Sequence, residues 1–578
     1  MATDPAADGE EAKRSAVESI KEKSRWLRGT LADELARPES DHFSDDDKQL
    51  LKFHGSYQQE DRDARKARSK VGVGKHYMFM VRLKLPGGKM TGKQWLALDD
   101  VAGTHANGTL RLTTRQSIQF HGILKSNLRQ SLQDINSALI TTLGACGDVN
   151  RNVIACPAPL KDQPRVEGQR LADAVAAHLA PRSNAYHDVW LNGEKLSSDA
   201  NETDGVEPIY GKVYLPRKFK TAFGLPHDNC VDVYSNDLGF LPAIEKGRVV
   251  GYNVLIGGGM GRTSGNKSTF PHLAQPLCFV EPDEVVAAAE AVVKFFRDHG
   301  NRGDRKRARL KYVIHDWGIE KVREVFGWDY WPKPIRRPRE LSVMAVDLHH
   351  GWHPQGDGKW FLGLSVENGR IKDEGSLRLR TALRKIIERF NTIVRITTQQ
   401  DILLGDIDAA NRPAIDSLLN EHGVERPENL SLVQKWSMAC PAIPTCGLAI
   451  TESERTLPGL VDELERTMAA LGLSNEALSV RMTGCPNGCA RPYNSDVGLV
   501  GRSGTKYTLF VGGHIRGDRL SFVLQDLVER DQIAPMLRKL LERYKGDRRA
   551  DEGFGGWCTR QGVESLCGVL GVPLPKPV

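Results

Sequence analysis

The sequence predicts an α+β protein in which one two-part unit occurs twice. Two observations lead to this fold class. Short strand-like runs alternate with amphipathic helices, and several segments of the first half of the chain recur in the second half. At a prior of roughly 150 residues per domain, the 578 residues allow three to five domains with large buried cores.

The elements follow in order along the chain. Residues 1 to about 70 are charged and carry only short helical patterns, so we expect an arm in which Lys48–Tyr57 is the first ordered segment. Residues 77–85 and 109–120 are rich in β-forming residues, and residues 93–102 and 127–143 have the apolar spacing of amphipathic helices. This alternation indicates mixed α and β domains.

The internal repeat consists of four pairs of similar segments, and the first two pairs are nearly equally spaced, with 34 positions from Phe79 to Thr113 and 36 from Phe361 to Thr397. The pairs are YMFMVRLKLPGGKM from Tyr77 with KWFLGLSVENGRI from Lys359, LRLTTRQSIQFHGI from Leu110 with VRITTQQDILLGDI from Val394, NRNVIACPAP from Asn150 with KWSMACPAIP from Lys435, and NVLIGGGMGR from Asn253 with TLFVGGHIRG from Thr508. A pseudo-twofold protein of this kind usually places its site in the crevice between the copies. The alternative is a shared architecture without a shared site.

Composition and charge exclude several classes of protein. The 80 Lys and Arg exceed the 73 Asp and Glu by only seven, and so small a basic excess argues against a dedicated nucleic-acid binder. No apolar run approaches the roughly 18 residues of a membrane helix. The acidic N-terminus has no apolar signal core, so we expect a cytoplasmic protein. Ten cysteines are too few for a disulfide scaffold, so close cysteine pairs indicate metal or redox sites.

Four cysteines lie in two short motifs of the second copy. Cys440 and Cys446 lie in CPAIPTC, Cys485 and Cys489 lie in CPNGC, and the spacing is C-x5-C, 38 residues, C-x3-C. Four thiolates from two loops suit an iron–sulfur cluster, whereas a zinc ribbon prefers two C-x2-C pairs. On spacing alone, structural zinc and buried unliganded cysteines remain alternatives. We expect the other six in the core: Cys146, Cys156, Cys230, Cys278, Cys558 and Cys567.

The residue strings around these cysteines resemble a known family. ACPAIPTCGLAITESER and MTGCPNGCARPYNSDVGLVG are closely similar to the sirohaem and 4Fe-4S site of the sulfite and nitrite reductases, and the similarity extends from Leu51 to Arg560. It implies ferredoxin-like half-domains at 71–145 and 346–424, each followed by a larger mixed α/β domain at 146–345 or 425–578, after an arm at 1–70. The first larger domain would supply anion-binding cations and the second would ligate the cluster.

The resemblance also implies which residues form the site. Cys440, Cys446, Cys485 and Cys489 would hold the cluster, with Cys489 also binding the sirohaem iron. Sirohaem carries eight carboxylates and the substrate is an oxyanion, so the pocket must be cationic. The cage around the anion would be Arg82, Arg151, Lys218 and Lys220, and the cofactor-side contacts would be Arg111, Arg115, Gln119, Lys306 and Asn487.

Several of these residues have a plainer interpretation. Any one Lys or Arg taken alone is usually a solvated surface residue, and Lys306 lies in the run Arg302–Lys311, which also fits a basic helix face. In the register of the repeat, we place RKFK, residues 217–220, where the second copy has CPNGC. The three glycines Gly257 to Gly259 would let backbone approach the macrocycle, or would simply form a tight turn.

The implied reaction is the six-electron reduction of sulfite to sulfide in assimilatory sulfur metabolism. Lys218 and Lys220 are candidate proton donors because a lysine crowded by cations can have a lowered pKa. The alternatives are a sirohaem nitrite reductase, disfavoured by Lys220 and NRNV, and a metal-stabilised nucleic-acid binding protein. Electrons would come from a partner protein, and the motifs favour ferredoxin slightly over an NADPH-dependent flavoprotein.

Overall fold

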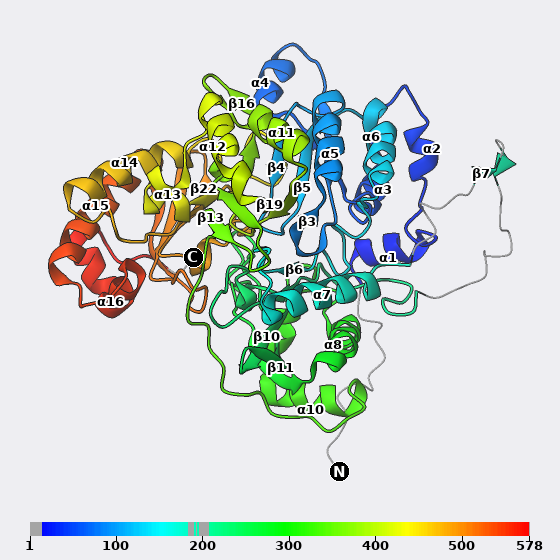
Figure 1. Ribbon diagram of the computed structural model, residues 1–578. Coiled ribbons are helices and arrows are strands. Elements are labelled where there is room, and N and C mark those ends of the chain that lie inside the picture. The colour runs from blue at the N-terminus through cyan, green and yellow to red at the C-terminus, as the bar shows by residue number, and fades with distance from the viewer. Residues whose placement is uncertain (1–13, 183–189, 192–193, 196–206, 577–578) are drawn as a thin grey trace.

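The computed structural model describes residues 14–182, 190–191, 194–195 and 207–576 (Figure 1). Most of the described strands belong to four five-stranded sheets, two in each copy of the repeat. Two of these sheets form the half-domains and two form the larger domains. None of the described helices combines the length and the apolar character needed to cross a membrane.

Each half-domain sheet takes its fifth strand from the other copy. The first sheet has the order β1-β2-β5-β4-β15 and the second has the order β13-β14-β19-β18-β3, so β15 of the second copy pairs with β4 and β3 of the first copy pairs with β18. The strands are β1 (Ser56–Glu60), β2 (Tyr77–Arg82), β3 (Lys89–Met90), β4 (Leu110–Leu112), β5 (Ile118–Ile123), β13 (Gly351–Pro354), β14 (Trp360–Leu364), β15 (Arg370–Ile371), β18 (Ile393–Ile396) and β19 (Ile402–Ile407).

The two half-domains share one hydrophobic core. Phe79 and Leu112 of the first sheet belong to the same cluster of buried side chains as Ile396 and Leu404 of the second. Helices of both copies cover these sheets. A capping box between Thr91 and Gln94 fixes the start of the first of these helices, α5. The helices, at the top of Figure 1, are α5 (Gly92–Thr104), α6 (Lys125–Ser137), α11 (Leu379–Phe390) and α12 (Arg412–Glu421).

The two larger domains have the same sheet topology. In β6-β9-β10-β11-β12 and in β20-β21-β22-β23-β24, the first three strands are parallel and the remaining pairs are antiparallel. The strands are β6 (Ile154–Ala155), β9 (Thr221–Phe223), β10 (Leu238–Glu245), β11 (Arg248–Ile256), β12 (Gln275–Val280), β20 (Met438–Ala439), β21 (Val480–Thr483), β22 (Val497–Ser503), β23 (Lys506–Val511) and β24 (Phe522–Glu529). This identity of topology confirms the predicted repeat.

The larger domains lie apart in Figure 1 and each has its own core. The first, at the bottom, carries α7 (Gln163–His178), α8 (Val285–His299), α9 (Leu310–Trp317) and α10 (Ile319–Asp329), and the second, at the left, carries α14 (Leu457–Ala470), α15 (Arg530–Asp547) and α16 (Phe554–Leu570). A small apolar cluster joins them, because Met260 of the first packs with Tyr493 and Phe510 of the second. The parts of the two domains that carry these residues are therefore held together.

Three expectations need correction. Residues 56–60, which we placed in the arm, form β1 and pair with β2 as the edge of the first sheet. RKFK precedes β9, whereas CPNGC follows β21, so the two motifs are not equivalent in the repeat. The run from Arg302 to Arg309 forms turns, and α9 begins only at Leu310. Each expectation was wrong because the same charge or sequence pattern is compatible with more than one backbone conformation.

The junction between the half-domains gives a testable prediction. Gly88 has φ +68°, and a Cβ there would lie 2.6 Å from the carbonyl oxygen of Ile396. We expect Gly88→Ala to cost about 1–3 kcal/mol and to lower the apparent Tm measured by differential scanning calorimetry. The matched control is Gly74→Ala, because nothing lies within 4 Å of a Cβ at Gly74. Equal Tm values for the two variants would contradict this account of the junction.

Candidate functional site

The four predicted cluster cysteines come from two adjacent loops of the second larger domain. Cys440 follows β20, Cys485 and Cys489 follow β21, and these two strands are parallel neighbours. The backbone N–H of Gly484 donates to Cys440 Sγ (3.4 Å), and Asn487 Nδ2 donates to Cys485 Sγ (3.5 Å). Cys440 and Cys485 are buried, Cys446 is half-buried, and Cys489 is exposed. The structure thus brings the predicted motifs together and leaves one sulfur accessible.

The four sulfurs influence one another electrostatically. Burial, with the nearby sulfur of Cys489, raises the pKa of the Cys440 thiol well above its usual range and raises the pKa of Cys485 to about 12. Four thiolates in this position therefore need a multivalent cation beside them. Among the described residues, these four sulfurs do not form a group within 4.8 Å, whereas a tetrahedral zinc ion would hold them about 3.8 Å apart. The spacing disfavours a single zinc ion.

Residues of the first half-domain hold the cysteine loops in place. Arg111 is fully buried; its Nη2 donates to the carbonyl of Ala439 (2.8 Å) and its Nε lies 3.2 Å from Glu454. Thr114 Oγ1 donates to the carbonyl of Cys489 (3.0 Å). Arg62 donates from Nη1 to the carbonyl of Cys446 (3.3 Å). The LRLTTRQ motif therefore positions the thiol loops from the opposite copy.

The predicted cations lie along the first copy. Arg82 ends β2, and its Nη1 lies 3.1 Å from Cys146 Sγ. With the Gln119 amide oriented to satisfy Arg82, the Gln119 side-chain oxygen accepts from Arg82 Nε (3.0 Å). Arg115 donates to the carbonyl of Thr221 (3.0 Å), and Arg151 donates to the carbonyl of Gly147 (3.1 Å). Backbone carbonyls orient Arg115 and Arg151, and the Gln119 amide orients Arg82, so these partners do not neutralise the guanidinium groups.

Lys218 and Lys220 complete this cationic group. Burial, with Arg151 and Arg217, lowers the pKa of Lys218 to about 7. Burial and Lys218 itself lower the pKa of Lys220 well below its usual range. The sulfur of Cys489 acts on Lys218 in the opposite direction. In the part of the chain that the structure describes, neither lysine forms an ion pair with a carboxylate. Lys218 of one copy therefore lies within electrostatic range of the accessible thiol of the other.

The glycine-rich loop 257–262 closes the site against the cysteine loop. Arg262 N–H donates to the carbonyl of Pro486 (2.9 Å), and a Cβ at Gly261 would lie 3.0 Å from the Asn487 carbonyl oxygen. Gly257 has φ +85° and packs against Ile314. The protein's own packing therefore requires glycine at this turn. Asn487 lies where the two loops meet.

Sequence reasoning missed some residues of the site and misjudged the setting of one. Lys306 is exposed, and its backbone N–H donates to Asp304 (2.8 Å), so its side chain has no contact with the cationic group. Arg309 is buried in an ion pair with Asp237 (2.7 Å), and both act electrostatically on Lys220. Nothing in the run of alternating basic residues indicates which side chain turns inward. Tyr57 lies beside Cys146 and Arg151 but was not assigned to the site, although it belongs to the similar string Leu51–Asp63.

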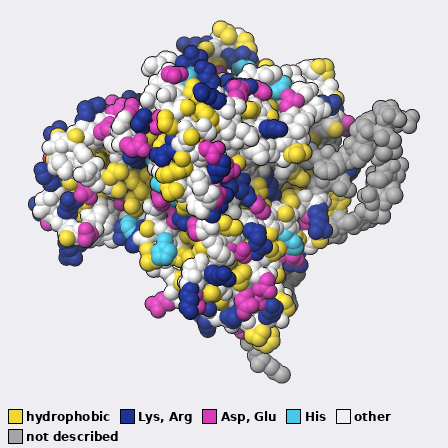
Figure 2. Space-filling model, in the orientation of Figure 1, with side chains coloured by type: hydrophobic (Ala, Val, Ile, Leu, Met, Phe, Trp, Pro, Cys, Tyr) yellow, Lys and Arg dark blue, Asp and Glu magenta, His cyan; other side chains and the backbone are white. Residues whose placement is uncertain are grey.

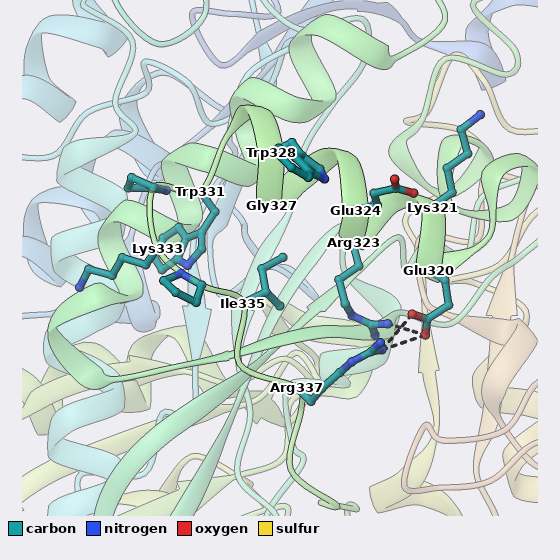
Figure 3. Close-up of a pocket in the computed structure, with 12 residues that line it drawn as sticks. Glu320, Lys321, Arg323, Glu324, Gly327, Trp328, Trp331, Lys333, Ile335 and Arg337 are labelled. Carbon is teal, nitrogen blue, oxygen red and sulfur yellow. Dashed lines mark hydrogen bonds and ion pairs between the residues drawn. The ribbon is translucent and has the colours of Figure 1, made fainter. Parts of the chain in front are cut away.

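A separate hollow of about 1040 Å³ lies beside α10 and contains none of the predicted site residues (Figure 3). Its lining includes Trp328 and Trp331, and Arg337 forms an ion pair with Glu320 (2.9 Å) at its edge. The hollow is therefore distinct from the thiol and cation site.

Comparison with known proteins identifies the family of the chain and agrees with its fold. Residues 172–335 match the family model described as the nitrite and sulphite reductase 4Fe-4S domain, and residues 73–138 and 353–422 match the nitrite/sulfite reductase ferredoxin-like half domain. The chain belongs to the nitrite and sulfite reductase family. The first model covers part of the first copy, including Lys218 and Lys220, whereas the four cysteines lie in the second copy. The predicted fold class, with two ferredoxin-like half-domains, is confirmed.

Members of this family match the chain over nearly its whole length. The sulfite reductase (ferredoxin) of Synechococcus elongatus is 45% identical over 574 residues, which covers 96% of this chain and 90% of the relative. The sulfite reductase (NADPH) hemoprotein beta-component of Staphylococcus haemolyticus is 42% identical, covering 95% and 96%. The Mycobacterium tuberculosis NirA protein has the same fold, with a TM-score of 0.77 at 24% identity over 96% of this chain and 98% of that chain.

The buried Arg111 contact gives a prediction about the cysteine loops. Arg111→Met removes the donor to the Ala439 carbonyl and leaves Glu454 with Arg370 as its remaining partner. We expect a loss of about 1–3 kcal/mol in the free energy of unfolding, measured by urea denaturation, together with a lower iron content. The control is Arg129→Met, since Arg129 is exposed. If Arg111→Met matches this control in both measurements, Arg111 does not position the loop.

Proposed function

We propose that the protein is a sulfite reductase that reduces sulfite to sulfide with six electrons in assimilatory sulfur metabolism. The observation that carries this proposal is a group of four neighbouring cations without a carboxylate ion pair, Arg82, Arg151, Lys218 and Lys220, of which Lys218 lies within electrostatic range of Cys489. Such a pocket suits a small oxyanion beside an anionic cofactor. Relatives that match 90–96% of their own length and are named sulfite reductase support the same substrate.

The residues present fit a 4Fe-4S cluster and a sirohaem. Four thiols too far apart for one zinc ion suit the cluster, and Cys489, the exposed one, is the proposed shared ligand of the haem iron. The buried Nε of Arg115 has no hydrogen-bond partner in the described structure and suits a cofactor carboxylate. The other proposed cofactor-side residues are Arg111, Gln119, Lys306 and Asn487. Among these, Lys306 has the least structural support because it is exposed.

The protein's part in the reaction is to hold the anion and to supply protons. When bound, the cluster and sirohaem supply the electrons one at a time. Arg82 and Arg151 would hold the sulfite oxygens through their guanidinium N–H groups. Sulfur falls from +4 to −2, and three oxygens leave as water, so six electrons and six protons are consumed. Lys218 and Lys220 would donate protons from Nζ, because burial and the neighbouring cations lower their pKa.

Two alternatives are less well supported. Nitrite reduction to ammonia also takes six electrons, but Lys220 favours sulfite. Nucleic-acid binding through the basic run would need free cations, and four residues of that run are already in ion pairs: Arg302 with Glu18, Arg305 with Asp148, Arg307 with Asp316 and Arg309 with Asp237. Basic and acidic side chains also alternate over the face in Figure 2.

The electron donor is proposed to be a separate protein, either ferredoxin or an NADPH-dependent flavoprotein. Relatives carrying each of these names match the chain about equally, and the motifs favour ferredoxin slightly. We propose a cytoplasmic location from the sparse cysteines. We also propose that the chain divides into an arm and four domains, at 1–70, 71–145, 146–345, 346–424 and 425–578. The four five-stranded sheets support these boundaries, except that β1 lies within 1–70 and that β3 and β15 each join a sheet of the other copy.

The decisive assay compares sulfite and nitrite with one reduced dye as electron donor. We expect a higher kcat/KM for sulfite, with sulfide as the product. A higher kcat/KM for nitrite, with ammonia as the product, would contradict the proposal. Replacing the dye with reduced ferredoxin or with an NADPH-reduced flavoprotein then identifies the class of donor.

Lys220 gives a prediction about proton supply. Lys220→Met removes the ammonium and should lower sulfite turnover by about 10²-fold or more, while the visible absorption of the bound cofactors persists. The matched control is Lys212→Met, since Lys212 is an exposed lysine of the same segment. Loss of the haem absorption in Lys220→Met would instead show that Lys220 holds the cofactor.

Lys218 gives a prediction about pH. Its pKa is lowered to about 7 by burial and by Arg151 and Arg217, so its positive charge is present below pH 7 and is lost as the pH rises through that value. We expect kcat/KM for sulfite to fall on the alkaline side of pH 7. In Lys218→Arg, which stays charged, this fall should move to higher pH. An unchanged alkaline limb in Lys218→Arg would exclude Lys218 as its source.

A further inference from the structure

The first copy carries a second group of metal-ligating side chains outside the site described above. Cys156 follows β6, and Asp228 and Cys230 follow β9. Since the two larger domains share one topology, these loops are the counterparts of the cysteine loops that follow β20 and β21. The first copy therefore has thiols in the loops that correspond to the cluster loops of the second.

One pair of hydrogen bonds establishes the correspondence of the loops that carry Cys230 and Cys489. Thr114 Oγ1 donates to the carbonyl of Cys489, and Thr398 Oγ1, at the same place in the TTRQ and TTQQ motifs, donates to the carbonyl of Cys230. Cys230 thus occupies the place of Cys489.

The second pair concerns the loops that carry Cys156 and Cys440. Gln116 Nε2 donates to the carbonyl of Ala155 (2.8 Å), and Gln400 Nε2 donates to the carbonyl of Ala439 (3.0 Å). The cysteine that follows each alanine is therefore equivalent, so Cys156 occupies the place of Cys440. Both thiols were expected to be ordinary core residues, and their burial agrees with that expectation.

The remaining ligand comes from the segment that leads into β13. His349 Nε2 lies 3.1 Å from Asp228 Oδ2 and 3.6 Å from Cys156 Sγ, and Cys156 Sγ lies 3.0 Å from Asp228 Oδ2. The ligand atoms of Cys156, Asp228, Cys230 and His349 all lie within 4.8 Å of one another. All four residues are at most 4% exposed. In the described part of the chain, no other group of three or more such side chains has this spacing.

This donor set has the geometry and chemistry of a structural zinc site. In tetrahedral zinc sites, Zn–S and Zn–N bonds of about 2.3 and 2.0 Å place the ligand atoms about 3.3–3.8 Å apart, which is near the distances between these side chains. Two sulfurs, one imidazole and one carboxylate complete four-coordination, and thiolates select zinc over magnesium or calcium. The four cluster cysteines are spaced more widely, so the two copies fit different metal groups.

The surroundings complete the site. Asp347 Oδ2 lies 3.5 Å from His349 Nδ1, on the side of the ring away from the ligand atoms, as outer carboxylates do beside metal-bound histidines. Arg165 Nη2 lies 3.2 Å from Asp228 Oδ2. Two thiolates, one carboxylate and one divalent ion carry a net charge of −1, which the Arg165 guanidinium offsets. The buried group is thereby electrically neutral.

We propose that Cys156, Cys230, His349 and Asp228 bind one Zn²⁺ ion, and that this ion ties the segment before β13 to the first larger domain. Binding replaces the two thiol protons, which leave to solvent. The segment already runs beside the Asp228 loop, since Met344 N–H donates to the carbonyl of Pro226 (2.7 Å) and Asn229 N–H donates to the carbonyl of Ala345 (2.9 Å). The ion would have no part in electron transfer.

The test is metal analysis of the untagged holoenzyme after dialysis against a chelator. We expect about one zinc per chain in addition to the iron of the cofactors, and zinc-edge X-ray absorption with two sulfur ligands near 2.3 Å and two nitrogen or oxygen ligands near 2.0 Å. Zinc below about a tenth of an equivalent, or a zinc shell without sulfur, would overturn the proposal. The absorption measurement uses the natural chain, so it decides even if a variant fails to fold.

A pair of variants localises the ion. Cys156→Ser combined with Cys230→Ser should lose zinc about tenfold or more while keeping the iron of the cluster. The matched control, Cys278→Ser, changes another buried cysteine of the same domain and should keep both metals. Zinc retained by the double variant would overturn the proposal. So would a mass shift that shows a disulfide between Cys156 and Cys230 in the natural protein.

Discussion

The site depends on a cluster of cations that the protein itself does not neutralise. The Gly147 carbonyl orients Arg151, and Gln119 and Cys146 contact Arg82. Burial, together with neighbouring cations, lowers the pKa of Lys218 and of Lys220. An arrangement of this kind is favourable only with anions inside it. The accessible Cys489 thiol lies within electrostatic range of Lys218. The proposed function places an anionic cofactor and an oxyanion between these groups.

Duplication explains how one chain builds such a pocket. The exchanged strands β3 and β15 and the shared core of the half-domains lock the two copies together, so groups on opposite copies keep a fixed separation. Thr114 of one copy holds the Cys489 loop of the other, and Thr398 holds the Cys230 loop in return. The same scaffold presents widely spaced thiols in one copy and a compact group of mixed ligands in the other.

Local motifs were predictable from the sequence, and long-range pairings were not. The repeat and the four predicted cluster cysteines are short local motifs, so the sequence alone indicates them. Cys156 and Cys230 were expected to be ordinary core residues. The fold brings Asp228 and His349, which are distant from each other in sequence, beside them, so the group could not be predicted from the sequence. Likewise, Arg309 turns inward while Lys306 points to solvent, and a run of alternating basic residues does not encode that difference. The predicted equivalence of RKFK and CPNGC was wrong, because RKFK precedes β9 whereas CPNGC follows β21, the counterpart of β9.

The most direct test of the account is the visible absorption spectrum of the protein purified from cells able to make sirohaem. If the cations and the Cys489 loop form one cofactor pocket, the spectrum will show the bands of an isobacteriochlorin-type haem that extend into the red, together with iron–sulfur absorption. A broad iron–sulfur shoulder alone, or no visible absorption, from protein produced in such cells would contradict the claim that the two copies enclose a haem.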